Sequence, residues 1–134
     1  MPKGTHKAPV VLAVSPDRKD PDTLERSLKG WSVRRAGSCH EAMSILKESA
    51  CNVVVCEKQL PDGGWHDLLN RMKELGAIPP LVVMAMAADE SLWAEVLRSG
   101  GFDLLSKPLE SSELNRIVPS AQTHGFERRV ATHA

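Results

Sequence analysis

The sequence predicts an α/β domain in which one parallel sheet of five strands lies between two layers of helices. Short apolar runs, three of them nearly continuous and rich in valine, alternate with amphipathic helical patterns along the chain. Continuous apolar strands are typical of a parallel sheet that is covered on both faces. The alternation demands right-handed crossovers, and five strands in 134 residues suit the strand order 2-1-3-4-5.

Five segments are expected to form the strands. The first is 9–14 (PVVLAV), and the weaker 31–36 (WSVRRA) is expected at an edge of the sheet. The third, fourth and fifth follow at 51–56 (CNVVVC), 80–86 (PLVVMAM) and 102–105 (FDLL). Ligands of open parallel sheets bind beyond the carboxyl ends of the strands, so the residues directly after each strand are the candidates for function.

The first helix follows the first strand. Asp20 is expected as its N-cap and Pro21 at its first helical position, with Gly30 as the stop signal. Leu24 and Leu28 lie on the face that should pack against the sheet.

Four more helices are expected further along the chain. Ser38 and Glu41 have the spacing of a capping box at the start of the second helix. The inward faces of the next two helices are expected to comprise Leu68, Leu69, Met72 and Leu75, and then Trp93, Val96 and Leu97. A last helix, 111–118, is expected to end or kink at Pro119.

Composition limits the classes of function. Hydrophobic residues make up 42% of the chain, enough for one core, and the formal net charge is zero. A neutral chain argues against binding nucleic acid or anionic membranes through charge alone, and no apolar run approaches the roughly 20 residues of a membrane span. Three cysteines, Cys39, Cys51 and Cys56, without a signal-peptide pattern, indicate reduced thiols in a cytoplasm. The five histidines lie at no metal-ligand spacing.

Four segments together carry a family resemblance. They are EKQLPDG (57–63), PLVVMA (80–85), RSGGFD (98–103) and LSKP (105–108). In this order and spacing they resemble the receiver domain of bacterial two-component response regulators, over 9–118. The resemblance implies the flavodoxin-like (βα)5 fold with three αβα layers. The remainder, 1–8 and 119–134, is expected to form flexible tails or a linker stub.

The resemblance implies a site for phosphoryl transfer. A working receiver has an acceptor aspartate after the third strand, two acidic Mg²⁺ ligands after the first, a Thr or Ser after the fourth and a lysine after the fifth. An aromatic residue on the fifth strand often reports the state. At these positions this chain carries Glu57, then Ser15 and Pro16, then Ala85, then Lys107, with Leu104 in the aromatic position.

Only the lysine is retained in this comparison. Asp17 directly follows Pro16, so it stays open whether Asp17 supplies one carboxylate of the acidic pair. Mg²⁺ demands near-octahedral oxygen ligands, so its binding is expected to be weak or absent, and no other cofactor is expected. Glu57 is one methylene longer than aspartate, and we expect it to form a static ion pair with Lys107 that partly mimics a modified aspartate. The alternatives are that Glu57 is a solvated acid at the start of a loop, and that Lys107 and Pro108 form a turn without a further role.

Two tryptophans have two interpretations each. Trp65 stands where receivers usually have a glycine, and it either packs against the start of the third helix or forms an exposed contact for a partner. Trp93 is also a candidate partner contact, although its spacing to Val96 and Leu97 favours the core.

These features predict a degenerate receiver, or pseudo-receiver. It would be a cytoplasmic protein-interaction module and not an enzyme, with an output that does not depend on phosphorylation. Its expected partner is a histidine kinase, another receiver or an output domain, and a homodimer is left open. The alternative is a receiver that still accepts a phosphoryl group in an ordinary phosphorelay. A flavodoxin-like ligand-binding protein or enzyme is disfavoured, because 15–22 (SPDRKDPD) contains no glycine for a phosphate loop.

Overall fold

The structure, a computed structural model, describes residues 8–76 and 78–133. Its main sheet is parallel throughout, with the order β2-β1-β3-β6-β7. The strands are β1 (Val10–Val14), β2 (Ser32–Ala36), β3 (Val53–Glu57), β6 (Leu81–Ala85) and β7 (Asp103–Ser106). Counted along the chain, this is the predicted order 2-1-3-4-5, and the predicted fold class is confirmed. None of the helices described is both long enough and apolar enough to cross a bilayer.

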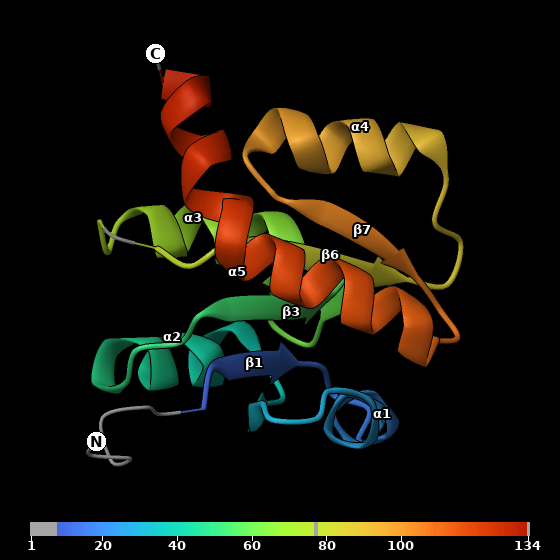
Figure 1. The fold of residues 1–134 in the computed structure, drawn as a ribbon. Coiled ribbons are helices and arrows are strands. Elements are labelled where there is room, and N and C mark those ends of the chain that lie inside the picture. The colour runs from blue at the N-terminus through green and yellow to red at the C-terminus, as the bar shows by residue number, and fades with distance from the viewer. Residues whose placement is uncertain (1–7, 77, 134) are drawn as a thin grey trace, which may run out of the picture.

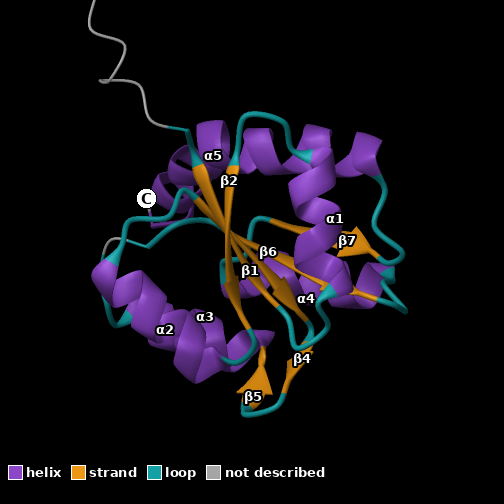
Figure 2. Ribbon diagram, turned by 90° about the horizontal axis from the view of Figure 1, so that it is seen from below, coloured by secondary structure: helices purple, strands orange, loops and turns teal. Residues whose placement is uncertain are grey.

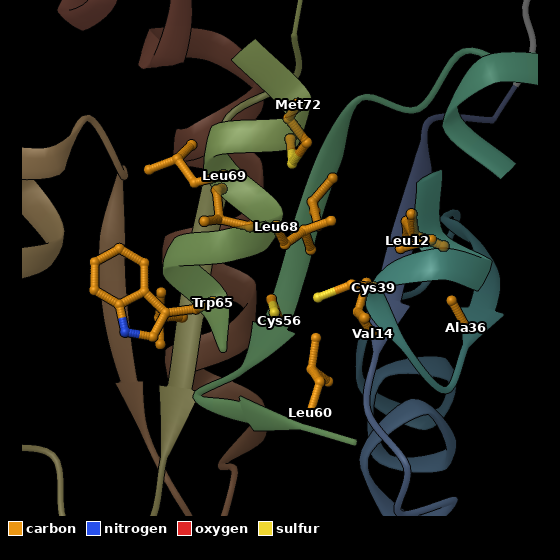
Figure 3. Close-up of a cluster of buried hydrophobic side chains, with 14 of the residues drawn as sticks. Leu12, Val14, Ala36, Cys39, Cys56, Leu60, Trp65, Leu68, Leu69 and Met72 are labelled. Carbon is orange, nitrogen blue, oxygen red and sulfur yellow. The ribbon is translucent and has the colours of Figure 1, made fainter. Parts of the chain in front are cut away.

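Five helices cover the two faces of the sheet. They are α1 (Lys19–Ser27), α2 (Cys39–Glu48), α3 (Trp65–Lys73), α4 (Glu90–Ser99) and α5 (Ser111–His133). Figure 1 shows the sheet between α5 and α1 on one side and α2 and α3 on the other. The core is therefore split in two. One cluster packs α2 and α3 on the sheet, and Figure 3 shows Leu68 and Met72 pointing toward β3 and β1.

The second cluster lies on the opposite face and explains why the strands do not alternate. In β1, Leu12 and Val14 belong to the first cluster, whereas Val11 and Ala13 belong to the second, with Leu24 of α1. All four strand residues are fully buried. A strand buried on both faces must be apolar at every position, as the sequence pattern indicated.

A small hairpin follows β3 and was not predicted. Its strands are β4 (Gln59–Leu60) and β5 (Gly63–Gly64), which pair antiparallel. Figure 2 shows it projecting beyond the main sheet, beside the start of α3. Gly63 has φ +147°, and a Cβ there would come within 2.9 Å of Asp67 Oδ2, so the turn requires a glycine. Gly64 has a φ of −102°, which other residues also adopt.

The prediction for the start of α1 was wrong. The helix begins at Lys19 with Arg18 as its N-cap, so Asp20 lies inside the first turn and Pro21 one residue further along. The carboxylate of Asp17 accepts a hydrogen bond from Lys19 N at 3.0 Å, which supports the earlier start. Asp20 is therefore turned inward, where it is 5% exposed.

The prediction that the last helix ends near Pro119 was also wrong. α5 runs from Ser111 to His133 with Pro119 inside it, and Figure 1 shows the helix bending before its C-terminal part. A proline removes one backbone hydrogen bond and bends a helix rather than always ending it. Here the buried face continues across the proline, from Val118 to Ala121, both fully buried. The packing of that face against the sheet supports the continuation.

Two of the predicted helix faces are displaced. Leu75 lies beyond the end of α3 and is exposed. In α4 the buried positions are Leu92 and Val96, one helical turn apart, and Trp93 faces away from the core. At the start of α2, Ser38 does accept a hydrogen bond from Glu41 N, but Glu41 in turn accepts from Gly37 N and not from Ser38.

Candidate functional site

The candidate site lies where the carboxyl ends of β1, β3, β6 and β7 meet. The register places Glu57, the last residue of β3, beside Met84 of β6, and Ala85 beside Ser106 of β7. Lys107 N donates to Ala85 O at 2.9 Å, which fixes the start of the loop after β7. Parallel strands thereby bring residues from distant parts of the chain to one edge of the sheet.

Lys107 and Glu57 are in direct contact. Lys107 Nζ donates a hydrogen bond to Glu57 Oε1 at 2.5 Å, and the two side chains are 13% and 17% exposed. The other oxygen of this carboxylate, Oε2, accepts from Lys58 N at 3.0 Å. Both oxygens of Glu57 are therefore engaged, and the carboxylate is not a solvated acid at a loop start.

A second carboxylate completes the site and was missed as a site residue by sequence reasoning. Asp20 Oδ2 accepts from Lys107 Nζ at 2.9 Å and from Ser15 Oγ at 2.7 Å. The Asp20 side chain is only 7% exposed, so α1 inserts it between the ends of β1 and β7. The signal was its helical spacing: Asp20, Leu24 and Leu28 are four residues apart and share one face.

The cluster contains one positive and two negative groups. One ammonium lies between two carboxylates, all three of them largely buried. Burial alone would lower the pKa of Lys107, but the hydrogen bonds from its ammonium to Glu57 and Asp20 outweigh it, and the pKa is raised above its ordinary value. The lysine is therefore held as a cation throughout the neutral pH range.

The remaining predicted site positions supply no further acid. Ser15 supports Asp20 through its hydroxyl, and Pro16 is exposed. Asp17 accepts from the backbone of Lys19 at the start of α1, so its side chain serves the helix and not the cluster. Ala85 is buried and contributes a methyl group where a receiver has a hydroxyl, and Leu104 is half-buried against the first core cluster.

The residues present do not fit the Mg²⁺ that a receiver site implies. The two carboxylates that approach each other, Asp20 and Glu57, both accept from the Lys107 ammonium. Residues 8–76 and 78–133 contain no group of three or more His, Cys, Asp or Glu side chains placed to hold a metal ion. Mg²⁺ requires several oxygen ligands in octahedral geometry, and here a lysine occupies the position between the two available ones.

The loop that follows Glu57 is tied to a neighbouring helix. Asp62, at the tip of the hairpin, accepts from Cys39 N at 2.8 Å and from His40 N at 3.0 Å, the first two backbone amides of α2. These hydrogen bonds from His40 and Cys39 lower the pKa of the Asp62 carboxyl. A carboxylate at a helix N-terminus satisfies amides that have no partner within the helix.

The structure separates the two tryptophans. Trp65 is 5% exposed and packs in the first core cluster beside Leu69, so its interpretation as a partner contact was wrong. Trp93 is 46% exposed, so its assignment to the core was wrong. Of the two, only Trp93 remains a candidate for contact with another molecule.

Comparisons with known proteins identify the family of this chain. Residues 18–119 match the family described as the response regulator receiver domain. The chain belongs to this family. The transcriptional regulatory protein ZraR of Salmonella typhimurium is 27% identical over 119 residues, which are 87% of this chain and 27% of that protein. An uncharacterized 14.6 kDa protein of Leptolyngbya boryana is 32% identical over 113 residues, covering 81% of this chain and 86% of that protein.

Solved structures agree with the fold. A putative response regulator from Chloroflexus aurantiacus superimposes with a TM-score of 0.80 at 27% identity, over 87% of this chain and 99% of the other. The signal receiver domain of a putative LuxO repressor protein from Vibrio parahaemolyticus gives 0.81 at 15% identity, over 92% and 96%, and shows the fold alone. The chain spans about a quarter of the length of the ZraR proteins that it matches.

Proposed function

We propose that this receiver domain is a protein-interaction module of two-component signalling whose output does not depend on phosphorylation. The observation that carries the proposal is the contact of one ammonium, that of Lys107, with the carboxylates of both Asp20 and Glu57. The two carboxylates of the site are thus already engaged by an internal cation.

Each requirement of phosphoryl transfer is weakened in this site. The reaction depends on a positioned nucleophile and on neutralising charge at the transferred oxygens. Glu57 has both oxygens engaged, by Lys107 and by the Lys58 amide. Ala85 offers no hydroxyl to the transferred group. The nucleophile would have to break two hydrogen bonds in order to react, and little would stabilise the product.

The partner is a protein of the same signalling class. Receiver domains interact with histidine kinases and output domains, and several relatives of this chain are named as transcriptional regulatory proteins. We therefore propose that a histidine kinase, another receiver or an output domain binds this module in the cytoplasm. It acts through its surface and catalyses no reaction of its own.

The experiment that tests the proposal measures phosphoryl transfer directly. The chain is incubated with acetyl phosphate and Mg²⁺, and its intact mass is followed over time beside a receiver with an intact acceptor site. We expect no gain of a phosphoryl group. The Glu57→Asp variant should also remain unmodified, because Lys107 would still contact Asp20 and position 85 would still lack a hydroxyl.

One outcome would establish the alternative function. A gain in mass equal to one phosphoryl group, on the wild-type chain and lost in Glu57→Gln, would assign it to an ordinary phosphorelay. Circular dichroism of each variant verifies that a negative result comes from a folded protein.

A further inference from the structure

The Lys107 ammonium is held by two carboxylates that come from different parts of the chain. Glu57 ends β3, whereas Asp20 comes from the first turn of α1. A lysine side chain has a long, flexible stem, so a single acceptor leaves its ammonium considerable freedom. Here one Nζ donates to two largely buried acceptors, at 2.5 Å and 2.9 Å. The position of the ammonium therefore depends on where α1 places Asp20.

The Asp20 carboxylate is itself fixed in place. Its Oδ2 accepts from Ser15 Oγ at 2.7 Å as well as from Lys107 Nζ, and the residue is 5% exposed. Ser15 directly follows β1, a strand with neighbours on both sides. The hydroxyl therefore orients the carboxylate from the end of an interior strand.

The helix that carries Asp20 is fastened along its length. Leu24 and Leu28, on the same face as Asp20, are buried in the second core cluster. At the last residue of the helix, Ser27 O accepts a hydrogen bond from the Asn115 side chain of α5 at 2.9 Å. Movement of Asp20 away from Lys107 would therefore disturb the packing of α1 on the sheet and its contact with α5.

The two loops that follow Glu57 and precede Lys107 in space are anchored to the same strand. Lys58 N donates to Met84 O and Lys107 N donates to Ala85 O, each at 2.9 Å, and both acceptors belong to β6. The backbone of the site is thus fixed to β6, and its side chains are fixed to α1. A rearrangement would have to break charged hydrogen bonds at a largely buried site, where a charge without its partner is costly.

We propose that Asp20 is a positioning residue that holds the Lys107 ammonium on Glu57, so that this edge of the domain keeps one conformation with or without Mg²⁺. A ligand shifts a conformational equilibrium only through a difference in its affinity for the two states. The two carboxylates of this site are engaged by Lys107, so Mg²⁺ has no such difference to exploit. The inference rests on the proposed function and gives a physical basis for its constant output.

The test is NMR spectroscopy of the full chain, uniformly labelled with ¹⁵N. The ammonium hydrogens of an exposed lysine exchange with water too quickly to be seen, whereas those of a buried and hydrogen-bonded ammonium exchange slowly enough to give a signal. We expect such a signal from Lys107, and no microsecond-to-millisecond relaxation dispersion at the backbone amides of Glu57 and Lys107. A large molar excess of Mg²⁺ should leave these two amide signals at the same positions.

Variants test the role of Asp20. Asp20→Asn keeps the size of the side chain and removes its charge, so exchange of the Lys107 ammonium hydrogens with water should become at least about tenfold faster. Relaxation dispersion should then appear at the amides of Glu57 and Lys107. Ser15→Ala removes only the hydroxyl that orients Asp20, and it should accelerate the ammonium exchange about threefold.

The matched control lies on the same helix. The Asp22 carboxylate pairs with Arg35 at the surface, with side chains that are 48% and 38% exposed. Asp22→Asn should therefore keep the ammonium signal and the flat dispersion profiles of the wild type. Circular dichroism verifies that each variant is folded, and the wild-type dispersion and Mg²⁺ measurements need no variant.

Three results would overturn the proposal. Unchanged ammonium exchange in both Asp20→Asn and Ser15→Ala would show that Glu57 alone holds Lys107. Relaxation dispersion at the wild-type amides of Glu57 and Lys107, or their displacement by Mg²⁺, would show that the site has more than one conformation. The acetyl phosphate experiment gives a separate answer. A chain that keeps one conformation but gains a phosphoryl group contradicts the proposed function, whereas an unmodified chain that changes conformation contradicts only this inference.

Discussion

Replacement of Lys107 by methionine removes the only ammonium from the Asp20–Glu57 cluster while keeping a side chain of similar length. At neutral pH the variant leaves two carboxylates, 7% and 17% exposed, without their cation. Removal of one partner from a buried ion pair is strongly destabilising because the other charge is left uncompensated. The variant therefore reports how much the cluster depends on its internal cation.

The magnitude follows from the contacts and the exposure. Loss of one partner from a fully buried pair costs about 3–5 kcal/mol, and the partial exposure of these side chains reduces this to about 2–4 kcal/mol in the free energy of unfolding.

The stability of the wild type should depend on pH in the alkaline range. Its folded-state Lys107 pKa is raised above the ordinary 10.5. The stability contributed by the lysine is therefore fully present below that pH and is lost as the pH rises through the folded-state pKa.

The assay is urea unfolding of the wild type, Lys107→Met, Glu57→Gln and the double variant, at about pH 7. The double-mutant cycle should give a coupling energy above about 1 kcal/mol. Lys47→Met, at an exposed lysine of α2, is the control and should change stability by less than about 0.5 kcal/mol. A loss at Lys107 no larger than at Lys47, or a coupling energy near zero, would show that Lys107 does not stabilise the two carboxylates.

Two further variants and one reagent test other parts of the structure. Asp62→Ala should lower the melting temperature at neutral pH, and in acid the melting temperatures of variant and wild type should become equal. The reason is that a carboxyl with a lowered pKa stabilises the fold at a pH above its unfolded-state pKa, near 3.9, and this stabilisation is lost as the pH falls. Equal melting curves at pH 7 would contradict this. Trp65→Ala should cost about 3–5 kcal/mol, as for a large side chain removed from a core, and a loss below about 1 kcal/mol would place Trp65 outside it. Burial raises the thiol pKa of all three cysteines, so exposure decides the order of their reaction with a thiol reagent. Half-buried Cys51 should react before unfolding, whereas buried Cys39 and Cys56 should react only after it. Mass spectrometry of the labelled peptides identifies the order.

Much of the fold could be predicted because it depends on patterns that the sequence carries locally. Continuous apolar strands and amphipathic helices in alternation leave few topologies, and the observed strand order is the predicted one. The errors lie where packing outweighs local propensity. Pro119 suggested a helix end, but the buried face from Leu114 to Ala121 carries the helix across it. Trp93 suggested a core position, but the buried stripe of α4 is displaced by one residue.

The candidate site was only partly predictable. The contact between Glu57 and Lys107 follows from the ends of two strands that both flank β6, which the topology places at one edge. Asp20 could not be placed by motif, because an acid before a proline is typical of a helix N-terminus and was read as a cap. The start of α1 at Lys19 decides that its side chain points inward. This start of the helix brings the Asp20 carboxylate to Lys107.

The link between Asp62 and α2 has a consequence for motion in this receiver. The hairpin after Glu57 is fastened to the first two amides of α2, those of Cys39 and His40. A displacement of the loop must therefore break both hydrogen bonds or carry the end of the helix with it. The exchange rates of these two amide hydrogens with deuterium should rise together whenever the loop opens. These two amides therefore report the opening of the loop.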